Sequence, residues 1–320
     1  MNNIKIGFIG TGGMAQMHAI ELLKMKHVEI AALADVSYQA MEHFSSKFHL
    51  QKVQKFSDYR LMLERADLDA VIIVSPHTLH FQQATDALNK GLHVLIEKPM
   101  TCSSKEAEQL IETAEKTGAV MQVSYQRHFQ PEFIYIRDAI AKGEIGNLTS
   151  ITASLYQQWW NGRPNGSWRQ DPKLSGGGFL MDSGSHIVDM LLWTTGLKPV
   201  EIKSHLSQQG APVEIDTFTS ILFEGGVVAG LNLVGCSPIW HETYAFCGDK
   251  GGIFYENNRI TLHRSGKEPI VPELPEQTTT SDKSFIDTIL GRHELKVPGE
   301  FALKVVEFSE NVYRAAGYAP

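Results

Sequence analysis

The chain has 320 residues, and its 29 lysines and arginines against 36 aspartates and glutamates give it a formal charge of −7. At about 150 residues per domain, this length predicts two domains. Hydrophobic residues make up 42% and charged residues 20% of the chain, which is typical of a folded globular protein. The acidic balance, with no basic run, argues against a nucleic-acid partner or an anionic membrane surface.

Neither a membrane span nor an export signal is visible. The longest apolar run, near 70–74, falls far short of the ~18 residues that a spanning helix needs. The first ten residues, MNNIKIGFIG, lack the charged region, apolar core and cleavage site of a signal peptide. The three cysteines form an odd set without metal-type spacing and suggest no disulfide framework. We therefore expect a cytoplasmic protein.

The first part of the chain alternates short apolar runs with helical patterns. The predicted strands are 5–9, 28–34, 69–75, 93–96 and 120–123. The predicted helices are 14–24, 38–48, 79–90 and 103–117. This alternation predicts right-handed βαβ units and an α/β domain with a mostly parallel, doubly wound sheet covered on both faces. We assign residues 1–123 to this domain.

The pattern changes after Tyr125. The predicted helices here are 133–142, 179–195, 281–290 and 301–316, and the predicted strands are 148–160, 200–206, 216–223, 227–233 and 243–247. The glycine-rich segment 224–226 is typical of a tight hairpin turn between consecutive strands, and 248–252 is predicted to be another turn. Residues 124–320 therefore read as an α+β domain with a mainly antiparallel sheet, whose C-terminal helix can pack back on the first domain.

A glycine-rich segment follows the first predicted strand and opens the first helix. Gly10-Thr11-Gly12-Gly13-Met14-Ala15 fits the pattern G-x-G-x-x-G/A. In a βαβ unit such glycines allow a tight turn and a close approach of the backbone to a pyrophosphate, which binds at the helix N-terminus. This context predicts a dinucleotide site rather than a purely structural turn.

Asp35 stands at the end of the second predicted strand. A carboxylate there can accept hydrogen bonds from the adenosine ribose hydroxyls and repels a 2′-phosphate. The residues that follow, Val36, Ser37 and Tyr38, include no arginine. NAD is therefore favoured over NADP, with a turn or helix-cap aspartate as the alternative interpretation.

Two polar segments follow the third and fourth predicted strands. Ser75-Pro76-His77 and Glu97-Lys98-Pro99 both lie at carboxyl ends of strands, where open α/β sheets bind ligands. The Lys98 ammonium could stabilise a developing alkoxide on a substrate oxygen. Spacing alone favours equally a surface salt bridge between Glu97 and Lys98.

Asp182 and His186 are spaced i and i+4, so they share one face of the predicted helix, and Asp189 continues that face at i+7. A carboxylate beside an imidazole fixes the tautomer that a general base needs. The preceding glycines, 176–178, would leave an open approach for a substrate. A structural aspartate–histidine pair is the alternative, and two ligands without a nearby cysteine argue against a metal.

Together these motifs resemble the Gfo/Idh/MocA family of glucose–fructose oxidoreductases, inositol dehydrogenases and MocA-like proteins. The match runs through essentially the whole chain in the family order. The residues that carry it are 10–15, Asp35, Ser75, Pro76, His80, Glu97-Lys98-Pro99, Trp168-Arg169, Gly176-Gly177-Gly178, Asp182, Gly184, His186, Asp189 and the turn 193–196.

The resemblance implies a Rossmann domain and an α+β domain whose open sheet mediates homodimers or homotetramers. It implies hydride exchange between the nicotinamide of NAD and a carbinol carbon of a sugar, cyclic polyol or related compound. Lys98 would bind the reacting oxygen and His186 would accept its proton. Asp182 would orient His186 or bind substrate.

The resemblance also assigns residues around these groups. Ser75, Pro76 and Glu97 belong to the cofactor site, His80 supports that loop, and a cis peptide is expected at Lys98–Pro99. The segment 125–128 would reach the cofactor and substrate.

Three side chains of the second domain complete the assignment. Arg127 would bind cofactor and substrate, with a structural ion pair as the alternative. Trp160 would cover a sugar face through its apolar surface, with core or interface packing as the alternative. His241 is a further candidate for the substrate site.

Two other functions stay open. Some relatives use NAD for transient oxidation, so that a glycoside is cleaved or a group eliminated without net redox change. A non-catalytic dinucleotide-binding regulator is the remaining class, and intact Lys98 and His186 argue against it. The particular substrate and the direction of the reaction are not specified by the sequence.

Overall fold

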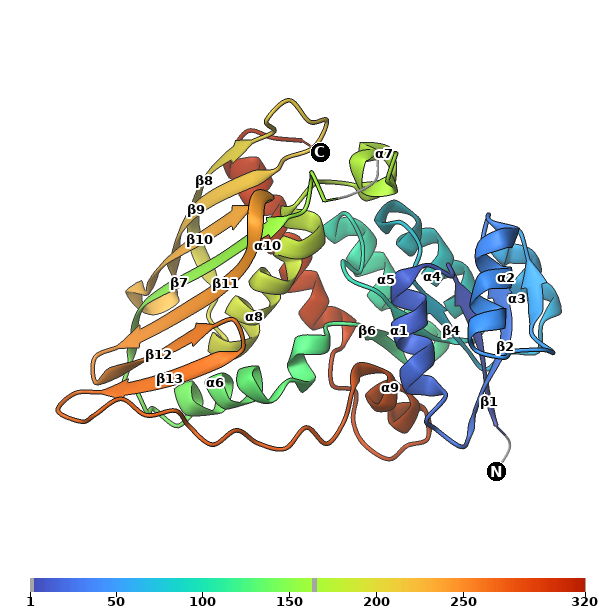
Figure 1. Cartoon of the computed structure of the whole chain (residues 1–320), viewed down its shortest axis with the longest axis horizontal. Coiled ribbons are helices and arrows are strands. Elements are labelled where there is room, and N and C mark those ends of the chain that lie inside the picture. The colour runs from blue at the N-terminus through green and yellow to red at the C-terminus, as the bar shows by residue number, and fades with distance from the viewer. Residues whose placement is uncertain (1–2, 163–165, 320) are drawn as a thin grey trace. The chain divides into compact units, whose positions relative to one another are not determined.

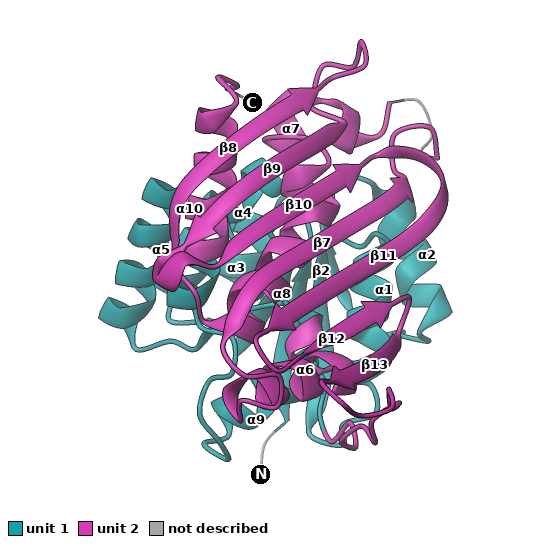
Figure 2. Ribbon diagram, turned by 90° about the vertical axis from the view of Figure 1, so that its left-hand side faces the viewer, with its two compact units in different colours: residues 1–126, 279–303 teal, residues 127–278, 304–320 magenta. Residues whose placement is uncertain are grey.

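The computed structural model describes residues 3–162 and 166–319. The chain forms two compact units, coloured separately in Figure 2. Unit 1 comprises residues 1–126 and 279–303, and unit 2 comprises residues 127–278 and 304–320. The segment 279–303, which the sequence analysis placed in the second domain, thus belongs to unit 1.

Unit 1 is built on a six-stranded sheet in which every neighbouring pair is parallel. Its order is β3-β2-β1-β4-β5-β6. The strands are β1 (Ile4–Ile9), β2 (Val28–Ala34), β3 (Gln54–Phe56), β4 (Ala70–Ile73), β5 (His93–Ile96) and β6 (Met121–Val123). This order reverses direction between β1 and β4, which is the point where doubly wound sheets bind ligands. The predicted parallel sheet is confirmed.

Several helices in the described part of the chain lie wholly within unit 1. They are α1 (Gly13–Leu22), α2 (Tyr38–Lys47), α3 (Tyr59–Arg65), α4 (His80–Asn89), α5 (Ser104–Thr117) and α9 (Ser281–Ile289), and a short helix η1 (His77–Leu79) precedes α4 (Figure 1). Phe8 of β1 packs against Phe44 of α2 with ring centroids 5.4 Å apart. Phe285 of α9 joins the same buried core, in which each large apolar side chain contributes about 1.5–3 kcal/mol.

The sequence analysis missed β3 and α3. The strand has three residues, none of them fully buried, so it carries no apolar run. The helix has seven residues, and its start depends on the Asp58 side chain, which accepts a hydrogen bond from the Arg60 N–H at 2.8 Å. Neither element is long enough to show a clear period.

Unit 2 is built on a seven-stranded mixed sheet of order β13-β12-β11-β7-β10-β9-β8. Its strands are β7 (Leu148–Gln158), β8 (Pro199–Ser207), β9 (Asp216–Phe223), β10 (Val228–Val234), β11 (Cys236–Gly248), β12 (Gly251–Glu256) and β13 (Arg259–Arg264). Strands β7 and β10 pair in parallel, and the other neighbours pair antiparallel. The predicted mainly antiparallel sheet and its hairpin at 224–226 are confirmed.

Strands β12 and β13 were not predicted. Their hairpin turns through Asn257 and Asn258, which have φ values of 45° and 69°. Asparagine tolerates this left-handed conformation, and two such residues in succession suit a tight hairpin turn. The Asn-Asn pair was therefore an available sequence signal.

Helices cover one face of this sheet, as Figure 2 shows from the opposite side. They are α6 (Pro131–Ala141), α8 (Ser185–Thr195) and α10 (Gly299–Ala315), while the short α7 (Pro172–Ser175) lies in the connection before α8. Phe133 of α6 packs edge-on against Tyr244 of β11, with ring centroids 5.6 Å apart. Alternate residues of β9, such as Phe218, point to the uncovered face and stay exposed.

Candidate active site

The glycine turn after β1 has room where a ligand needs it. Gly10 has a φ of +95°, and a Cβ there would lie 2.8 Å from the Val74 carbonyl oxygen, so a side chain is excluded. Nothing lies within 4 Å of a Cβ built on Gly12 or Gly13. Helix α1 starts at Gly13 with no side-chain cap and no acidic residue in its first turn. Its first N–H groups therefore suit an anionic pyrophosphate.

The Asp35 carboxylate is held at the end of β2 by three hydrogen bonds. The Thr11 N–H and hydroxyl donate to Oδ2 at 2.8 and 2.9 Å, and the Ser37 N–H donates to Oδ1 at 2.8 Å. A carboxylate offers about four acceptor positions, so one stays open for a ribose hydroxyl. Asp35 is thus also the turn aspartate that the sequence analysis gave as the alternative.

The Glu97-Lys98-Pro99 segment leaves the end of β5 with a cis peptide at Lys98–Pro99. Lys98 is partly exposed, whereas Glu97 is buried. The Glu97 carboxylate accepts hydrogen bonds from the Lys98 N–H at 3.3 Å and from the Gln126 side chain at 3.0 Å. Glu97 therefore belongs to the turn that presents Lys98.

Glu97 also contacts a histidine that the sequence analysis missed. His18 of α1 lies between two buried carboxylates, with Nε2 3.1 Å from Glu97 Oε1 and Nδ1 2.7 Å from Asp282 Oδ1. Burial alone would lower the pKa of His18, but Asp282 and Glu97 raise it to about 10. The imidazolium in turn keeps the pKa of Glu97 below its usual value, against the effect of burial.

His80 connects the two polar segments at the strand ends. Its Nδ1 lies 2.8 Å from the Pro99 carbonyl oxygen and its Nε2 lies 2.9 Å from the Ser75 carbonyl oxygen. Burial lowers the pKa of His80, although both carbonyls favour the protonated ring. Ser75 donates to Gln83 at 2.6 Å, and Pro76 precedes η1. The predicted support of this loop remains a proposal.

In unit 2, the predicted helix over 179–195 starts differently from expectation. Residues Leu180–Gly184 form a π-helical turn, in which the Gly184 N–H donates to the Phe179 carbonyl at 2.8 Å. The wider turn breaks the i, i+4 geometry from which Asp182 and His186 were placed on one α-helical face. π turns inside helices are frequent at functional sites.

The Asp182 carboxylate is buried and already has two strong donors. Trp159 Nε1 donates to Oδ2 at 2.7 Å, and Arg169 Nε donates to the same oxygen at 2.6 Å. His186 lies in the first turn of α8 and is partly exposed, between buried neighbours. The third residue of the predicted face, Asp189, is fully buried and pairs with His128 at 2.7 Å, and burial raises its pKa.

The expectation that the glycines at 176–178 leave an open approach is wrong for two of them. A Cβ on Gly177 would lie 2.6 Å from the Tyr313 hydroxyl, and one on Gly178 would lie 1.9 Å from the Glu214 carbonyl oxygen. These glycines are required by packing against buried polar groups. Glu214 and Tyr313 were not singled out by the sequence analysis.

Three further predicted residues lie elsewhere in unit 2. Arg127 forms a two-pronged ion pair with buried Glu242 and donates to the Tyr244 hydroxyl at 3.0 Å, so the structural ion pair is present. Trp160 is partly exposed, and its backbone N–H donates to the Gly235 carbonyl at 3.0 Å. His241 is also partly exposed, with Nδ1 3.2 Å from Asn257. Their binding roles remain proposals.

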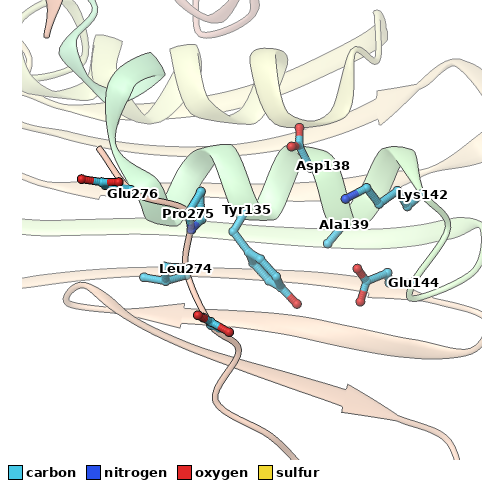
Figure 3. A pocket seen from close by; sticks show the side chains of 9 residues that line it. Tyr135, Asp138, Ala139, Lys142, Glu144, Leu274, Pro275 and Glu276 are labelled. Atoms are coloured by element: carbon cyan, nitrogen blue, oxygen red, sulfur yellow. The ribbon is translucent and has the colours of Figure 1, made fainter. Parts of the chain in front are cut away.

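A surface groove in unit 2 contains none of the predicted residues. Figure 3 shows it between α6 and the segment 273–276. It is acidic, although Asp138 pairs with Arg137 and Glu144 pairs with Arg264.

Within residues 3–162 and 166–319, no three His, Cys, Asp or Glu side chains are arranged to hold a metal ion. No helix in these ranges is long and apolar enough to cross a bilayer.

The sheet order of unit 1 and its glycine turn define a Rossmann-type, NAD-binding protein, and comparison with known families agrees. Residues 4–125 match the oxidoreductase family with an NAD-binding Rossmann fold, and residues 133–254 match the GFO/IDH/MocA C-terminal domain. The chain belongs to the Gfo/Idh/MocA family of oxidoreductases, as its motifs predicted.

Several relatives have named activities. D-glucoside 3-dehydrogenase of Escherichia coli is 25% identical over 98% of this chain and 95% of that protein. The dTDP-3,4-didehydro-2,6-dideoxy-alpha-D-glucose 3-reductase of Actinomadura kijaniata is 31% identical over 84% of this chain and 79% of that protein. The rhizopine catabolism protein MocA of Rhizobium meliloti is 30% identical, but the match spans 63% of this chain and 61% of that protein.

The fold is also that of a dehydrogenase of known structure. The structure of levoglucosan dehydrogenase with NADH and levoglucosan superimposes with a TM-score of 0.86, covering 99% of this chain and 98% of that chain. The two sequences are 19% identical, so this likeness concerns the fold.

Proposed function

We propose that the chain is an NAD-dependent dehydrogenase that oxidises a secondary hydroxyl of a sugar or cyclic polyol. The register of unit 1 carries this proposal. Ile9, just before Gly10, pairs with Ile73, and Ile73 pairs with Ile96, two residues before Lys98. A partly exposed cation thus stands at the same sheet edge as the dinucleotide turn, where open α/β sheets bind their ligands.

The residues supply the acid–base part of this reaction. NAD, when bound, accepts the hydride from the carbinol carbon. The Lys98 ammonium donates a hydrogen bond to the hydroxyl oxygen and stabilises the negative charge that develops on it. His186 accepts the hydroxyl proton, so the carbinol loses one hydride and one proton and becomes a carbonyl. Asp182 orders the turn that presents His186, through its bonds to Trp159 and Arg169.

The relatives suggest a substrate class. Two of them, described above, are named for reactions at position 3 of a glucose-derived ring. We therefore propose oxidation at C3 of a glucopyranose-type ring as the first chemistry to test. Trp160 offers a partly exposed aromatic surface for a sugar face, and His241 offers a polar group.

A rate measurement tests the proposal. NADH formation is followed with D-glucosides, aldoses, sugar acids and inositols, with NAD⁺ and NADP⁺ in parallel. Turnover with NAD⁺ on a glucoside supports the proposal. Product formation without net NADH would favour the transient-oxidation alternative. No turnover and no NAD binding would refute the dehydrogenase assignment.

Lys98→Met tests the role of the cation. We expect turnover to fall by about 100-fold or more, as for a lost polarising or proton-transfer group, with nearly unchanged NAD affinity. Lys90→Met, an exposed lysine at the end of α4, is the matched control and should behave like the wild type. Wild-type turnover in the Lys98 variant would remove this residue from the mechanism.

Two finer proposals concern assembly and location. We propose self-association through the uncovered face of the unit 2 sheet, where Phe218 is exposed, and sedimentation of the wild type and Phe218→Lys would test it. We propose a cytoplasmic location, supported by the absence of disulfides among the described residues, and cell fractionation would test it.

A further inference from the structure

Glu214 bonds to three consecutive N–H groups at the start of the π turn. The Gly178 N–H donates to its Oε2 at 2.7 Å, and the Leu180 N–H donates to its Oε1 at 3.0 Å. Between them, the Phe179 N–H donates to the Glu214 carbonyl at 3.0 Å. The first N–H groups of a helical segment have no acceptor within it, so partners must come from elsewhere. Here one residue, distant in sequence, supplies all three.

Glu214 is closely packed on the sides that face Tyr313 and Gly178. Glu214 is fully buried, and the Tyr313 hydroxyl of α10 donates to its Oε1 at 2.9 Å. Gly178 approaches both its carbonyl and its carboxylate so closely that no side chain fits. Glu214 is therefore in direct contact with both Tyr313 and Gly178.

The residues held by Glu214 connect directly to the proposed site. The Asp182 N–H donates to the Gly178 carbonyl at 3.0 Å, and the Gly184 N–H donates to the Phe179 carbonyl. His186 follows Gly184 by two residues. A shift of residues 178–180 would thus be transmitted through the backbone to both proposed site residues.

We propose that Glu214 is a positioning residue, whose ionised carboxylate fixes residues 178–180 and thereby orients Asp182 and His186. The inference rests on the proposed function for the roles of those two side chains. Glu214 itself acts through the backbone.

The charge state of Glu214 decides whether it can hold the turn. Burial raises its pKa to about 7, against the hydrogen bonds from Tyr313 and the two N–H groups. Tyr313 and Tyr318 are the titratable side chains that face it, and no cation forms an ion pair with it in the described part of the chain. Protonation places an O–H donor on an oxygen that accepts an N–H or O–H bond. The turn should therefore loosen as the pH falls through 7.

Hydrogen–deuterium exchange of the full chain without cofactor tests this directly. Glu214→Gln places an amide donor against one of the N–H groups, so amides 178–182 should exchange about tenfold faster, the effect of one lost hydrogen bond. Leu262→Ala is the matched control. It removes buried apolar contacts from β13, at the sheet edge away from β8 and β9, and should not accelerate these amides relative to the rest of unit 2.

A second measurement, the pH dependence of exchange in the wild type, does not depend on folding of the variant. Its exchange at 178–182, corrected for the intrinsic pH dependence, should rise below pH 7, and the Gln variant should lack this rise. Equal protection in wild type and variant would overturn the proposal. A wild-type profile that stays flat across pH 7 would overturn it as well.

Turnover separates this proposal from the proposed function. Glu214→Gln should lower kcat by about 100-fold, the effect of a misplaced reacting group, and leave NAD affinity near the wild-type value. Faster exchange with an unchanged kcat would overturn the positioning role. Faster exchange in the variant of a protein whose wild type neither turns over substrate nor binds NAD would support the contact between Glu214 and the turn and would refute the proposed function.

Discussion

Replacing His18 should change how the stability of the folded chain depends on pH. His18 is buried between Glu97 and Asp282, which are themselves buried. Removing the imidazolium leaves two buried carboxylates without their shared cation, a type of change that costs about 3–5 kcal/mol. We choose His18→Gln, because its amide can still donate one hydrogen bond to either carboxylate.

The stabilisation that protonated His18 gives the fold follows from its pKa, which is about 10 in the folded protein against 6.5 for the ordinary side chain. Each pKa unit corresponds to about 1.4 kcal/mol, so the protonated histidine stabilises the fold by about 5 kcal/mol. Because the folded pKa is the higher one, this stabilisation is fully present below pH 6.5 and is lost as the pH rises towards 10. About 3 kcal/mol should disappear between pH 6.5 and 9.

Equilibrium urea unfolding, followed by far-UV circular dichroism, measures the effect. The difference in unfolding free energy between wild type and His18→Gln should shrink by that amount from pH 6.5 to 9. His43→Gln, an exposed histidine on α2 in the same unit, should track the wild type throughout. A wild-type advantage over His18→Gln that is the same at both pH values would refute the reasoning, because His18 would then not be charged in the folded state.

Three further outcomes are expected. Gly178→Ala should destabilise unit 2 by more than about 3 kcal/mol in urea unfolding, because its Cβ would overlap the Glu214 carbonyl, whereas Gly230→Ala, with open space around it, should cost less than about 1 kcal/mol. Asp35→Asn should raise the ratio of NADP⁺ to NAD⁺ use about tenfold in kcat/KM, since a repulsion of about 1.4 kcal/mol is removed. Arg127→Met should cost about 3–5 kcal/mol by leaving Glu242 buried and unpaired, and Met at both positions should recover most of the loss, as measured by tryptophan fluorescence. Equal stability of the single and double variants would contradict an ion pair as the main role of Arg127.

The parts of the fold that could be predicted are those specified by neighbouring residues. β2 and β5 occupy the predicted ranges because their apolar runs are bounded by turn residues. The Gly10 turn was visible because a tight turn, a helix start and a strand end fall within a few residues. The family could be recognised for the same reason, since its motifs are short and local.

The supports of the candidate site could not be predicted, because they join residues far apart in the chain. Asp282 reaches His18 across 264 positions, and Tyr313 reaches Glu214 across 99. No period or spacing in the sequence reports such contacts. The lone glutamate in the apolar stretch Pro212-Val213-Glu214-Ile215 was the available sign of a buried carboxylate that needs hydrogen-bond donors.

The glycines before the π turn were recognised as significant in the sequence, but the reason given for them was wrong. Sequence reasoning explained 176–178 by an open path for substrate, whereas Gly177 and Gly178 are glycines because Tyr313 and Glu214 occupy the space that a Cβ would need. Glycine signals a close approach without identifying what approaches. At a helix start the first N–H groups need acceptors from outside the helix. A buried acceptor from another element provides them, and its close approach also explains why glycine is required. Substitution of Gly178 therefore probes the Glu214 contact, and its effect on turnover cannot be assigned to substrate access.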